Sequence, residues 1–343
     1  MSSAPLLTLQ LLLPGLVPGP PEAWTGALPR LPALQRLLAR AERSASFCDH
    51  LPALLLTGFG VERQQDWPAA PFSLLGDAVD PGSDMWLLAQ PVHLLARQSS
   101  LVLADPHRLR LSAQECEALL ATVNRHFAHD GLVFCAPQPR RWYLRVPQDL
   151  RVRTTLPCVV AGHGVDAFLP QGADALLLHG WFNEIQMLLH DHPVNTARED
   201  RGEPAVNTLW IWGAGRLVEP AAAAASGVWG EDPLLRGLAR AGGLPALAPP
   251  AGAAEWLAQA QPGEHWILLD ALQDPNPDPD SDWSARAEAL ERSWFAPLLA
   301  ALTARRLRGV TLATHHRGQA LRFSLEPGDL WKVWRRRIGL AHE

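Results

Sequence analysis

Short, mostly apolar runs recur along this chain and alternate with segments whose apolar residues have helical spacing. Leu6–Leu13, His265–Leu272 and Val310–Thr314 are such runs. They are typical of central strands in a parallel sheet, because both faces of such a sheet are covered. Leu28–Arg43 and Asp280–Leu302 carry the helical spacing. The alternation predicts an α/β fold built on a mostly parallel sheet.

The pattern changes between about residues 90 and 147, where the elements become shorter. Ser112 followed by Glu115 forms a capping box, which predicts a helix that reaches about Phe127. Two expected strands precede this helix and two follow it: Val92–Ala96, Leu101–Ala104, Leu132–Ala136 and Trp142–Val146. The order predicts an inserted α+β unit of the ββαββ type.

These two patterns divide the chain. We expect a discontinuous α/β core at residues 1–88 and 152–330, an inserted α+β lid domain at residues 89–151, and a basic C-terminal tail at residues 331–343. Within the core, Val206–Trp212 is expected to form a strand. Pro193 is expected to end the helix that begins near Ala173, because the residue before a proline disfavours the helical conformation.

The bulk properties exclude several classes of function. The net charge is −5, so the chain as a whole does not attract nucleic acid or an anionic lipid surface. The 4 cysteines form no CxxC pair, which argues against a zinc ribbon or a dithiol redox site. No apolar run reaches the roughly 18–20 residues that a membrane span needs. We therefore expect a cytoplasmic protein with neither a membrane nor a nucleic acid as partner.

The segment His190–Gly215 combines imidazoles, amides, a guanidinium and glycines, a mixture suited to holding an anion. Asn195 and Arg198 are three residues apart and share a face if the segment is helical. A guanidinium fork matches a phosphate or a carboxylate. The candidate ligand-binding residues are Asn195, Arg198, Asn207, His192, Gly213 and Gly215.

Structural roles are the alternatives for the same residues. Asn195, Arg198 and Asn207 could instead form a buried polar network that locks the loop. The spacing of His190 and His192 leaves a helix-end role, ligand binding and metal binding open. A pair of glycines such as Gly213 and Gly215 is also typical of a turn.

This segment resembles the central signature of the archaeal-type cofactor-independent phosphoglycerate mutases. Leu51–Gly60 and Pro91–His93 resemble, in the same order, parts of that family before its glycine-rich loop and in its lid domain. Asn183–His190 and Arg141–Arg145 look closer to the bacterial RpfE-type regulatory proteins. The resemblance implies the three-layer core of the alkaline-phosphatase-like superfamily, with an inserted lid.

The resemblance also implies two divalent metals, which need several carboxylates and imidazoles at strand ends. This chain departs from the family pattern at three such places. Pro14-Gly15 stands where the resemblance implies Asp-Gly, Gln273–Pro277 contains no His, and Ala313–His316 lacks the Asp. The remaining weak candidates for metal ligands are Asp270, Asp274, His315 and His316. No catalytic residue is identified.

We therefore expect a catalytically degenerate phosphoglycerate-mutase-like protein. It would act in regulation by binding a small phosphorylated or anionic metabolite, or a protein partner, without a cofactor. One alternative is an active metal-dependent phosphomutase or phosphatase, whose rearranged site would hold Mn or Zn. Another is a purely structural or interaction protein. Metal bound to the purified protein, together with turnover, would support the metal-dependent enzyme. Loss of stability in Asn195→Ala, without any binding of an anion to the protein, would favour the structural protein.

Overall fold

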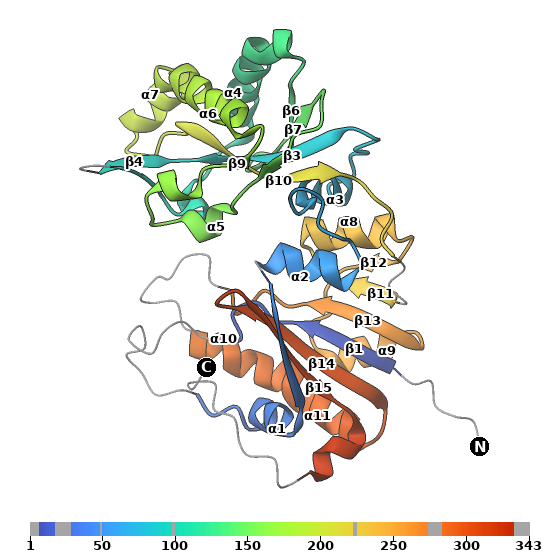
Figure 1. Ribbon diagram of the computed structural model, residues 1–343. Coiled ribbons are helices and arrows are strands. Elements are labelled where there is room, and N and C mark those ends of the chain that lie inside the picture. Colours follow the sequence, from blue (N-terminus) through green and yellow to red (C-terminus); the bar gives the residue numbers. More distant parts are fainter. Residues whose placement is uncertain are drawn as a thin grey trace. The chain divides into compact units, whose positions relative to one another are not determined.

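The computed structural model describes residues 7–17, 29–48, 50–97, 100–221, 225–273 and 283–332. The chain divides into two compact units, one formed by residues 1–60 and 220–343 and the other by residues 61–219 (Figure 1). Asp274 and residues 333–343 of the expected basic tail lie outside the described residues. No helix formed by the described residues is long and apolar enough to cross a membrane.

Seven strands of the first unit form one sheet. They are β1 (Leu7–Leu12), β2 (Glu42–Phe47), β11 (Ala225–Trp229), β12 (Ala246–Leu247), β13 (Gly263–Leu268), β14 (Leu307–His316) and β15 (Gln319–Leu325), in the order β12-β11-β13-β1-β14-β15-β2. The five strands from β12 to β14 are parallel, whereas β15 and β2 pair antiparallel at one edge. The mostly parallel central sheet expected from the sequence is confirmed.

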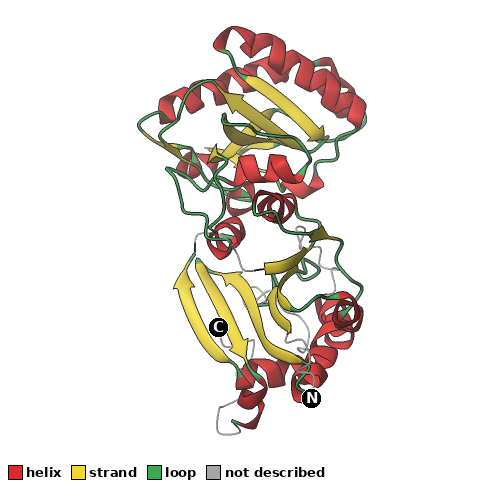
Figure 2. Ribbon diagram, turned by 90° about the vertical axis from the view of Figure 1, so that its right-hand side faces the viewer, coloured by secondary structure: helices red, strands yellow, loops and turns green. Residues whose placement is uncertain are grey.

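Helices cover both faces of this sheet (Figures 1 and 2). The helices are α2 (Leu51–Gly58) and α8 (Pro233–Ala241) on one face, and α1 (Pro32–Arg40), α9 (Ala253–Gln259), α10 (Trp283–Leu290) and α11 (Ala296–Thr303) on the other, with a 3-10 turn at Pro327–Trp331. Leu9 and Leu11 of β1 are fully buried against Leu37 and Leu298 of the second group. These apolar contacts supply the main stabilisation of the unit.

A π-helical segment, Glu291–Phe295, joins α10 and α11 within the single helix that the spacing predicts. Glu291 is 8% exposed, and its carboxylate accepts hydrogen bonds from the backbone N–H groups of Ala33 (2.6 Å) and Leu34 (3.1 Å). These groups belong to the first turn of α1, whose N–H groups have no partner within the helix. The π-helical segment thus places a carboxylate where it caps a neighbouring helix.

The second unit is built on an antiparallel sheet of four strands. They are β3 (Met85–Val92), β6 (Val133–Gln138), β7 (Arg141–Val146) and β10 (Thr208–Arg216), in the order β10-β3-β7-β6. In Figure 1, α4 (Ala113–His126), α6 (Ala175–His190) and α7 (Pro193–Asp200) lie on one side of this sheet, and α3 (Ala69–Gly76) lies on the other. Trp142 and Ile185 are fully buried between the sheet and the helices.

Smaller elements complete the second unit. Two ladders of two strands each are formed by β4 (Leu94–Arg97) with β5 (Ser100–Leu103) and by β8 (Val152–Arg153) with β9 (Gln171–Gly172). The connections contain α5 (Pro157–Val160) and 3-10 turns at Pro106–Arg108, Phe127–Asp130 and Val165–Phe168. The capping box of Ser112 and Glu115 is present at the start of α4, as predicted.

The boundary of the insert differs from the expectation. The second unit runs from Val61 to Glu219 and not over residues 89–151. The reason is the pairing of β10 with β3, in which Thr208 lies opposite Val92 and Arg216 lies opposite Met85. The strand expected in the parallel core therefore belongs to the antiparallel sheet, and the helices α6 and α7 that precede it in the chain belong to the same unit.

Pro193 also has a different role from the expected one. The helix α6 ends at His190, and Pro193 is the first residue of the next helix, α7. Proline is favoured at this position because its missing N–H would have no partner there and its φ angle already suits a helix. The whole signature segment, from His190 to Gly215, consequently lies in the second unit.

Candidate functional site

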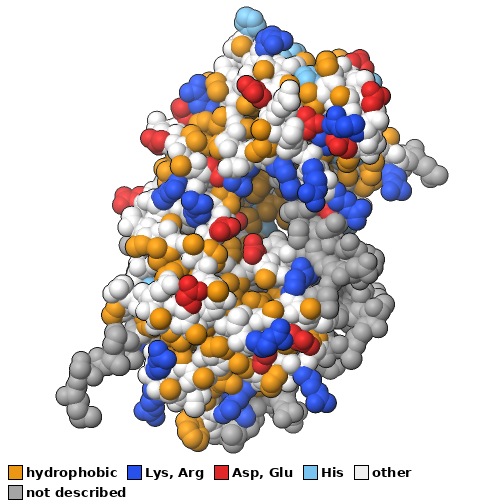
Figure 3. All heavy atoms as spheres, turned by 180° about the vertical axis from the view of Figure 1, so that it is seen from behind, with side chains coloured by type: hydrophobic (Ala, Val, Ile, Leu, Met, Phe, Trp, Pro, Cys, Tyr) orange, Lys and Arg blue, Asp and Glu red, His pale blue; other side chains and the backbone are white. Residues whose placement is uncertain are grey.

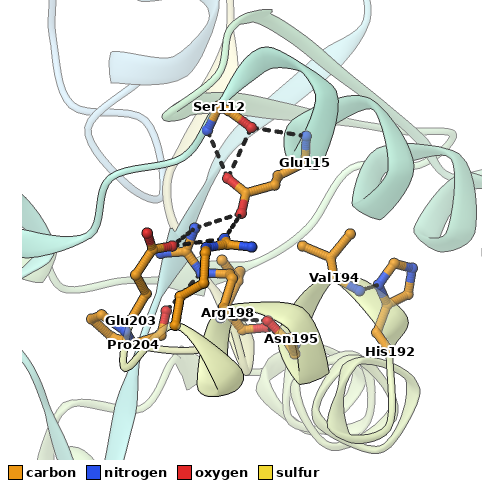
Figure 4. Close-up of polar contacts among 10 residues, drawn as sticks. Ser112, Glu115, His192, Val194, Asn195, Arg198, Glu203 and Pro204 are labelled. Atoms are coloured by element: carbon orange, nitrogen blue, oxygen red, sulfur yellow. Dashed lines mark hydrogen bonds and ion pairs between the residues drawn. The ribbon is translucent and has the colours of Figure 1, made fainter.

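His192 is the N-cap of α7 (Figure 4), and both of its ring nitrogens are engaged. Nδ1 accepts a hydrogen bond from the Val194 N–H at 3.2 Å, and Nε2 lies 3.1 Å from the Thr122 hydroxyl. Burial lowers the pKa of His192, which favours the neutral ring that can accept at Nδ1. His190 is exposed, and its Nε2 lies 3.9 Å from the carboxylate of the exposed Asp191. The structure therefore places the two imidazoles in different surroundings.

Asn195 is 1% exposed, and its amide binds three backbone groups. Its Nδ2 donates to the carbonyl oxygens of Leu189 (2.7 Å) and Val206 (2.8 Å), and its Oδ1 accepts from the Val206 N–H at 2.8 Å. Both amide hydrogens are thus used inside the protein. Asn195 joins the end of α6 to the segment that leads into β10.

Arg198 is also 1% exposed and lies one turn further along α7. Its Nε donates to the Pro204 carbonyl oxygen at 2.8 Å, and its Nη1 donates to Oε1 of Glu115 at 3.1 Å (Figure 4). The same carboxylate oxygen accepts from Arg201 at 2.7 Å, and Glu203 lies 3.5 Å from Arg198. The guanidinium therefore anchors α7 to the first turn of α4.

Glu115 combines this ion pair with the capping box of α4. Its carboxylate accepts hydrogen bonds at 2.9 Å from the backbone N–H and from the hydroxyl of Ser112. Desolvation raises the pKa of Glu115, but the bonds from Ser112 and the charge of Arg198 outweigh it and lower the pKa to about 2. Glu115 is therefore ionised at neutral pH and compensates the buried guanidinium.

The side chain of Asn207 forms hydrogen bonds to the backbone of β4, as a neighbouring strand would. Its Oδ1 accepts from the Leu94 N–H at 2.7 Å, and its Nδ2 donates to the Leu94 carbonyl oxygen at 2.8 Å. His93 Nδ1 lies 2.8 Å from the carbonyl oxygen of Ala205, close by in the chain. The loop that follows α7 is thereby attached to the β4–β5 ladder at two points.

Gly213 and Gly215 lie in β10, where its register with β3 shifts. Gly213 has a φ of +71°, which a residue with a side chain rarely adopts. A Cβ atom at Gly215 would lie 2.5 Å from a carbon of Pro68, so only glycine permits this close approach. The Gly213 N–H donates to the Thr154 hydroxyl at 2.9 Å, and Thr154 in turn donates to the buried Asp66. The glycine pair forms a bulge that holds two neighbouring segments together.

These contacts match the alternative in which the signature residues form a buried polar network. Asn195 and Arg198 share a face of α7, as the spacing predicts, but that face points into the protein. Ligand binding through their polar groups would require breaking the internal bonds, which is costly for buried groups. The structure thus bonds the polar groups of Asn195, Arg198 and Asn207 within the protein, and direct ligand binding by these residues stays a prediction.

The expected metal candidates lie in the first unit. His315 Nε2 is 3.0 Å from the Cys48 carbonyl oxygen, and because a carbonyl only accepts, this nitrogen carries a hydrogen and has no lone pair for a metal. Asp270 is exposed, and His316 lies opposite Gln319 in the β14–β15 pair. Within the described ranges, no group of three or more His, Cys, Asp or Glu residues is placed to hold a metal ion. The donors present there do not fit a two-metal centre.

Packing closes the end of β1, where the resemblance implies a metal site. A Cβ atom at Gly15 would lie 2.4 Å from the Leu272 carbonyl oxygen, and the indole N–H of Trp283 donates to the Gly15 carbonyl oxygen at 3.0 Å. Pro14 offers no side-chain ligand. The turn after β1 is therefore filled by backbone and indole contacts.

A basic pocket of the second unit was not found from the sequence. It has a volume of about 480 Å³ and is lined by Arg63, Gln65, Arg151, Val152, Arg153, Gly172 and Ala173. The lining comes from the segment before α3 and from the β8–β9 ladder. Three arginines in one pocket can hold an anion. No local sequence motif predicts that these three arginines form one site, because Arg63 and Arg151 are far apart in the sequence.

Basic, acidic and hydrophobic side chains are interspersed on the face of the molecule that Figure 3 presents. This pattern is unlike the broad basic surface with which a protein follows a nucleic acid backbone.

Comparison with known proteins adds a partial likeness in sequence and a likeness in fold. No family model matches the chain. It is 25% identical over 170 residues to a 2,3-bisphosphoglycerate-independent phosphoglycerate mutase of Methanosarcina acetivorans, which covers 48% of this chain and 43% of the relative. It is 36% identical over 61 residues to the protein of that name in Methanothrix thermoacetophila, or 18% of this chain and 16% of the relative.

The chain thus aligns with less than half of the length of these curated relatives. The structure of the PH0037 protein from Pyrococcus horikoshii aligns with 93% of this chain and 87% of its own, with a TM-score of 0.55 and 16% identity. This protein and PH0037 share a mixed α/β fold. Over part of its length, the chain is similar in sequence to proteins named 2,3-bisphosphoglycerate-independent phosphoglycerate mutase.

Proposed function

We propose that this chain is a catalytically degenerate phosphoglycerate-mutase-like protein of the alkaline-phosphatase-like superfamily. It binds a small phosphorylated or anionic metabolite and acts in a regulatory role, like the RpfE-type proteins that its sequence resembles. The observation that carries the proposal is the contrast between the polar network of the signature segment and the strand ends of the parallel sheet. At those strand ends, the described residues offer no set of metal ligands.

Two-metal phosphoryl transfer needs ligands that neutralise the charge of the transferred group and activate the nucleophile. The described strand ends offer the closed turn at Gly15 and an imidazole, His315, whose Nε2 is directed at a carbonyl. A pair of divalent ions is not held by such groups. The proposed activity is therefore binding without turnover.

A second candidate is a purely structural or interaction protein, and the contacts of Asn195 and Arg198 favour it. Both side chains are buried and form hydrogen bonds to neighbouring groups of the protein itself. Under this candidate the signature serves only to hold α4, α7 and β10 together. The two candidates differ in whether an anionic metabolite binds.

The test uses the full chain, first stripped of metal and then supplied with Mn or Zn. Interconversion of phosphoglycerates and hydrolysis of a phosphomonoester are measured, together with calorimetric binding of 3-phosphoglycerate. We expect binding without turnover under every metal condition. Metal-dependent turnover that disappears in His315→Ala would overturn the proposal in favour of a rearranged metal enzyme drawing on Asp270, Asp274, His315 and His316. Absence of both turnover and binding would favour the structural candidate.

A further inference from the structure

The basic pocket defined above has an excess of positive charge. Asp174 accepts hydrogen bonds from Arg151 Nε (3.2 Å), from its Nη2 (3.3 Å) and from its backbone N–H (2.7 Å), so that one guanidinium has a carboxylate partner. Among the residues that the structure describes, no hydrogen bond or ion pair is found for the exposed guanidinium of Arg153. Arg63 adds a third charge; it lies 6.0 Å from the ring centroid of Trp67 and interacts electrostatically with Asp66.

The segments that carry these arginines are tied together beneath the pocket. Thr154 follows Arg153 and donates its hydroxyl to Asp66, which is 3% exposed; the same carboxylate accepts the Thr154 N–H at 3.1 Å. Asp66 stands three residues after Arg63, so this contact joins the two arginine-bearing segments. This contact fixes the backbone positions from which the arginines project, which lowers the cost of ordering a binding site.

The glycine bulge of the signature supports the same two segments. The Gly213 N–H donates to the Thr154 hydroxyl at 2.9 Å. Two residues further on, the narrow space at Gly215 admits Pro68. The amide of Gln64, next to Arg63, exchanges hydrogen bonds of 2.8 and 3.0 Å with the backbone of Arg216. The end of the signature is thus connected with the pocket, although none of its residues lines it.

The size and the charge of the pocket define its ligand. A volume of about 480 Å³ lies in the range of small-molecule sites. Guanidinium groups bind a phosphate through paired N–H···O bonds, and a doubly charged phosphate monoester gains more from several positive charges than a single carboxylate does. The lining offers few apolar side chains, chiefly Val152 and Ala173, so the ligand is a polar one.

We propose that the pocket of Arg63, Arg151 and Arg153 binds a small phosphate monoester and that the Gly213–Gly215 bulge holds the pocket in shape. This inference rests on the proposed function, because it locates the metabolite site of a protein proposed to bind one. It assigns the signature segment a supporting role and places the ligand contacts outside that segment.

The experiment measures calorimetric binding of inorganic phosphate, 3-phosphoglycerate and glycerate to the full chain. Arg153→Gln and Arg63→Gln/Arg153→Gln remove the pocket charges, and Arg125→Gln removes an exposed arginine of α4 as a matched control. We expect the dissociation constant for phosphate and for 3-phosphoglycerate to rise about tenfold in Arg153→Gln and further in the double variant, and to stay unchanged in Arg125→Gln. Near-UV circular dichroism checks that each variant is folded.

Each of the following outcomes would overturn one part of the proposal. If the wild type binds phosphate and both pocket variants bind it equally well, the pocket is not the site, and the proposed function survives. If glycerate binds as tightly as 3-phosphoglycerate, the ligand class is wrong. If the wild type binds neither phosphate nor 3-phosphoglycerate, the inference and the proposed function fail together.

Discussion

The strand ends of the first unit and the α7–β10 region of the second unit use polar groups in opposite ways. After β1, Gly15 approaches the Leu272 carbonyl so closely that no side chain fits at this position. The described residues there assemble no set of metal ligands. In the α7–β10 region, by contrast, Asn195 and Arg198 are buried together with their partners. The difference teaches that buried polar residues can hold a loop of the second unit in place, whereas the described strand ends of the first unit are closed by packing.

Buried polar groups of the first unit have a different task. Glu291 caps α1, and His265 lies between Trp229 and Trp256, with Nε2 at 2.7 Å from the Gln261 carbonyl oxygen. These groups satisfy backbone atoms within the packed layers. In the second unit, Glu115 and Arg198 instead join separate helices through an ion pair. The following predictions test whether the second unit depends on its buried charges more than the first does.

Glu115→Ala should have the largest effect. It removes the 3.1 Å carboxylate partner of the Arg198 guanidinium, which is 1% exposed and keeps only the more distant Glu203 at 3.5 Å, and it also removes the capping box of α4. Loss of one partner of a buried ion pair typically costs about 3–5 kcal/mol. Urea unfolding measures the change, and hydrogen exchange shows whether it is confined to residues 61–219. Glu117→Ala, at an exposed position of the same helix, is the control; equal destabilisation by both would contradict the assignment.

Asn195→Ala should destabilise the second unit by about 3 kcal/mol, because it removes the side-chain partner of the Val206 N–H and carbonyl groups and one of the donors to the Leu189 carbonyl. The exposed Asn183 of α6 provides the matched control, Asn183→Ala. Thermal unfolding compares the two variants. A neutral Asn195→Ala would show that the network does not hold the loop.

Glu291→Ala should cost the first unit about 2 kcal/mol, since the capped N–H groups of Ala33 and Leu34 lose their acceptor. Glu288→Ala, in the exposed part of the same helix, serves as the reference. Faster hydrogen exchange at the start of α1 alone is the expected signature. A loss larger than that of Glu115→Ala would reverse the comparison between the units.

The contribution of Glu115 to stability should also depend on pH. Its pKa falls from 4.5 to about 2 on folding, so the ionised form is stabilised in the folded protein. The stability difference between wild type and Glu115→Gln should be complete above pH 4.5 and should shrink as the pH falls towards 2. Urea titrations at several pH values measure it. A difference that persists unchanged at low pH would show that the charge of Glu115 is not its source.

Several elements could be predicted because they depend on local pattern. The capping box at Ser112 and the buried strand at the start of the chain are present as expected. The extent of the insert could not be predicted, because β10 and β3 are distant in the sequence and their pairing is a tertiary event. The role predicted for Pro193, to end a helix, is wrong because a proline is also favoured at the first position of a helix, which it occupies in α7.

The sequence by itself determined the layered α/β part, the change of pattern at the insert and the residues of the polar signature, because periodicity and capping act over a few residues. Only the tertiary structure decided what those signature residues do. It buries Asn195 and Arg198 against partners, and it brings Arg63 together with Arg151 and Arg153 in one pocket. Burial and the meeting of distant charges depend on which strands pair and which helices pack, and no local pattern carries that information.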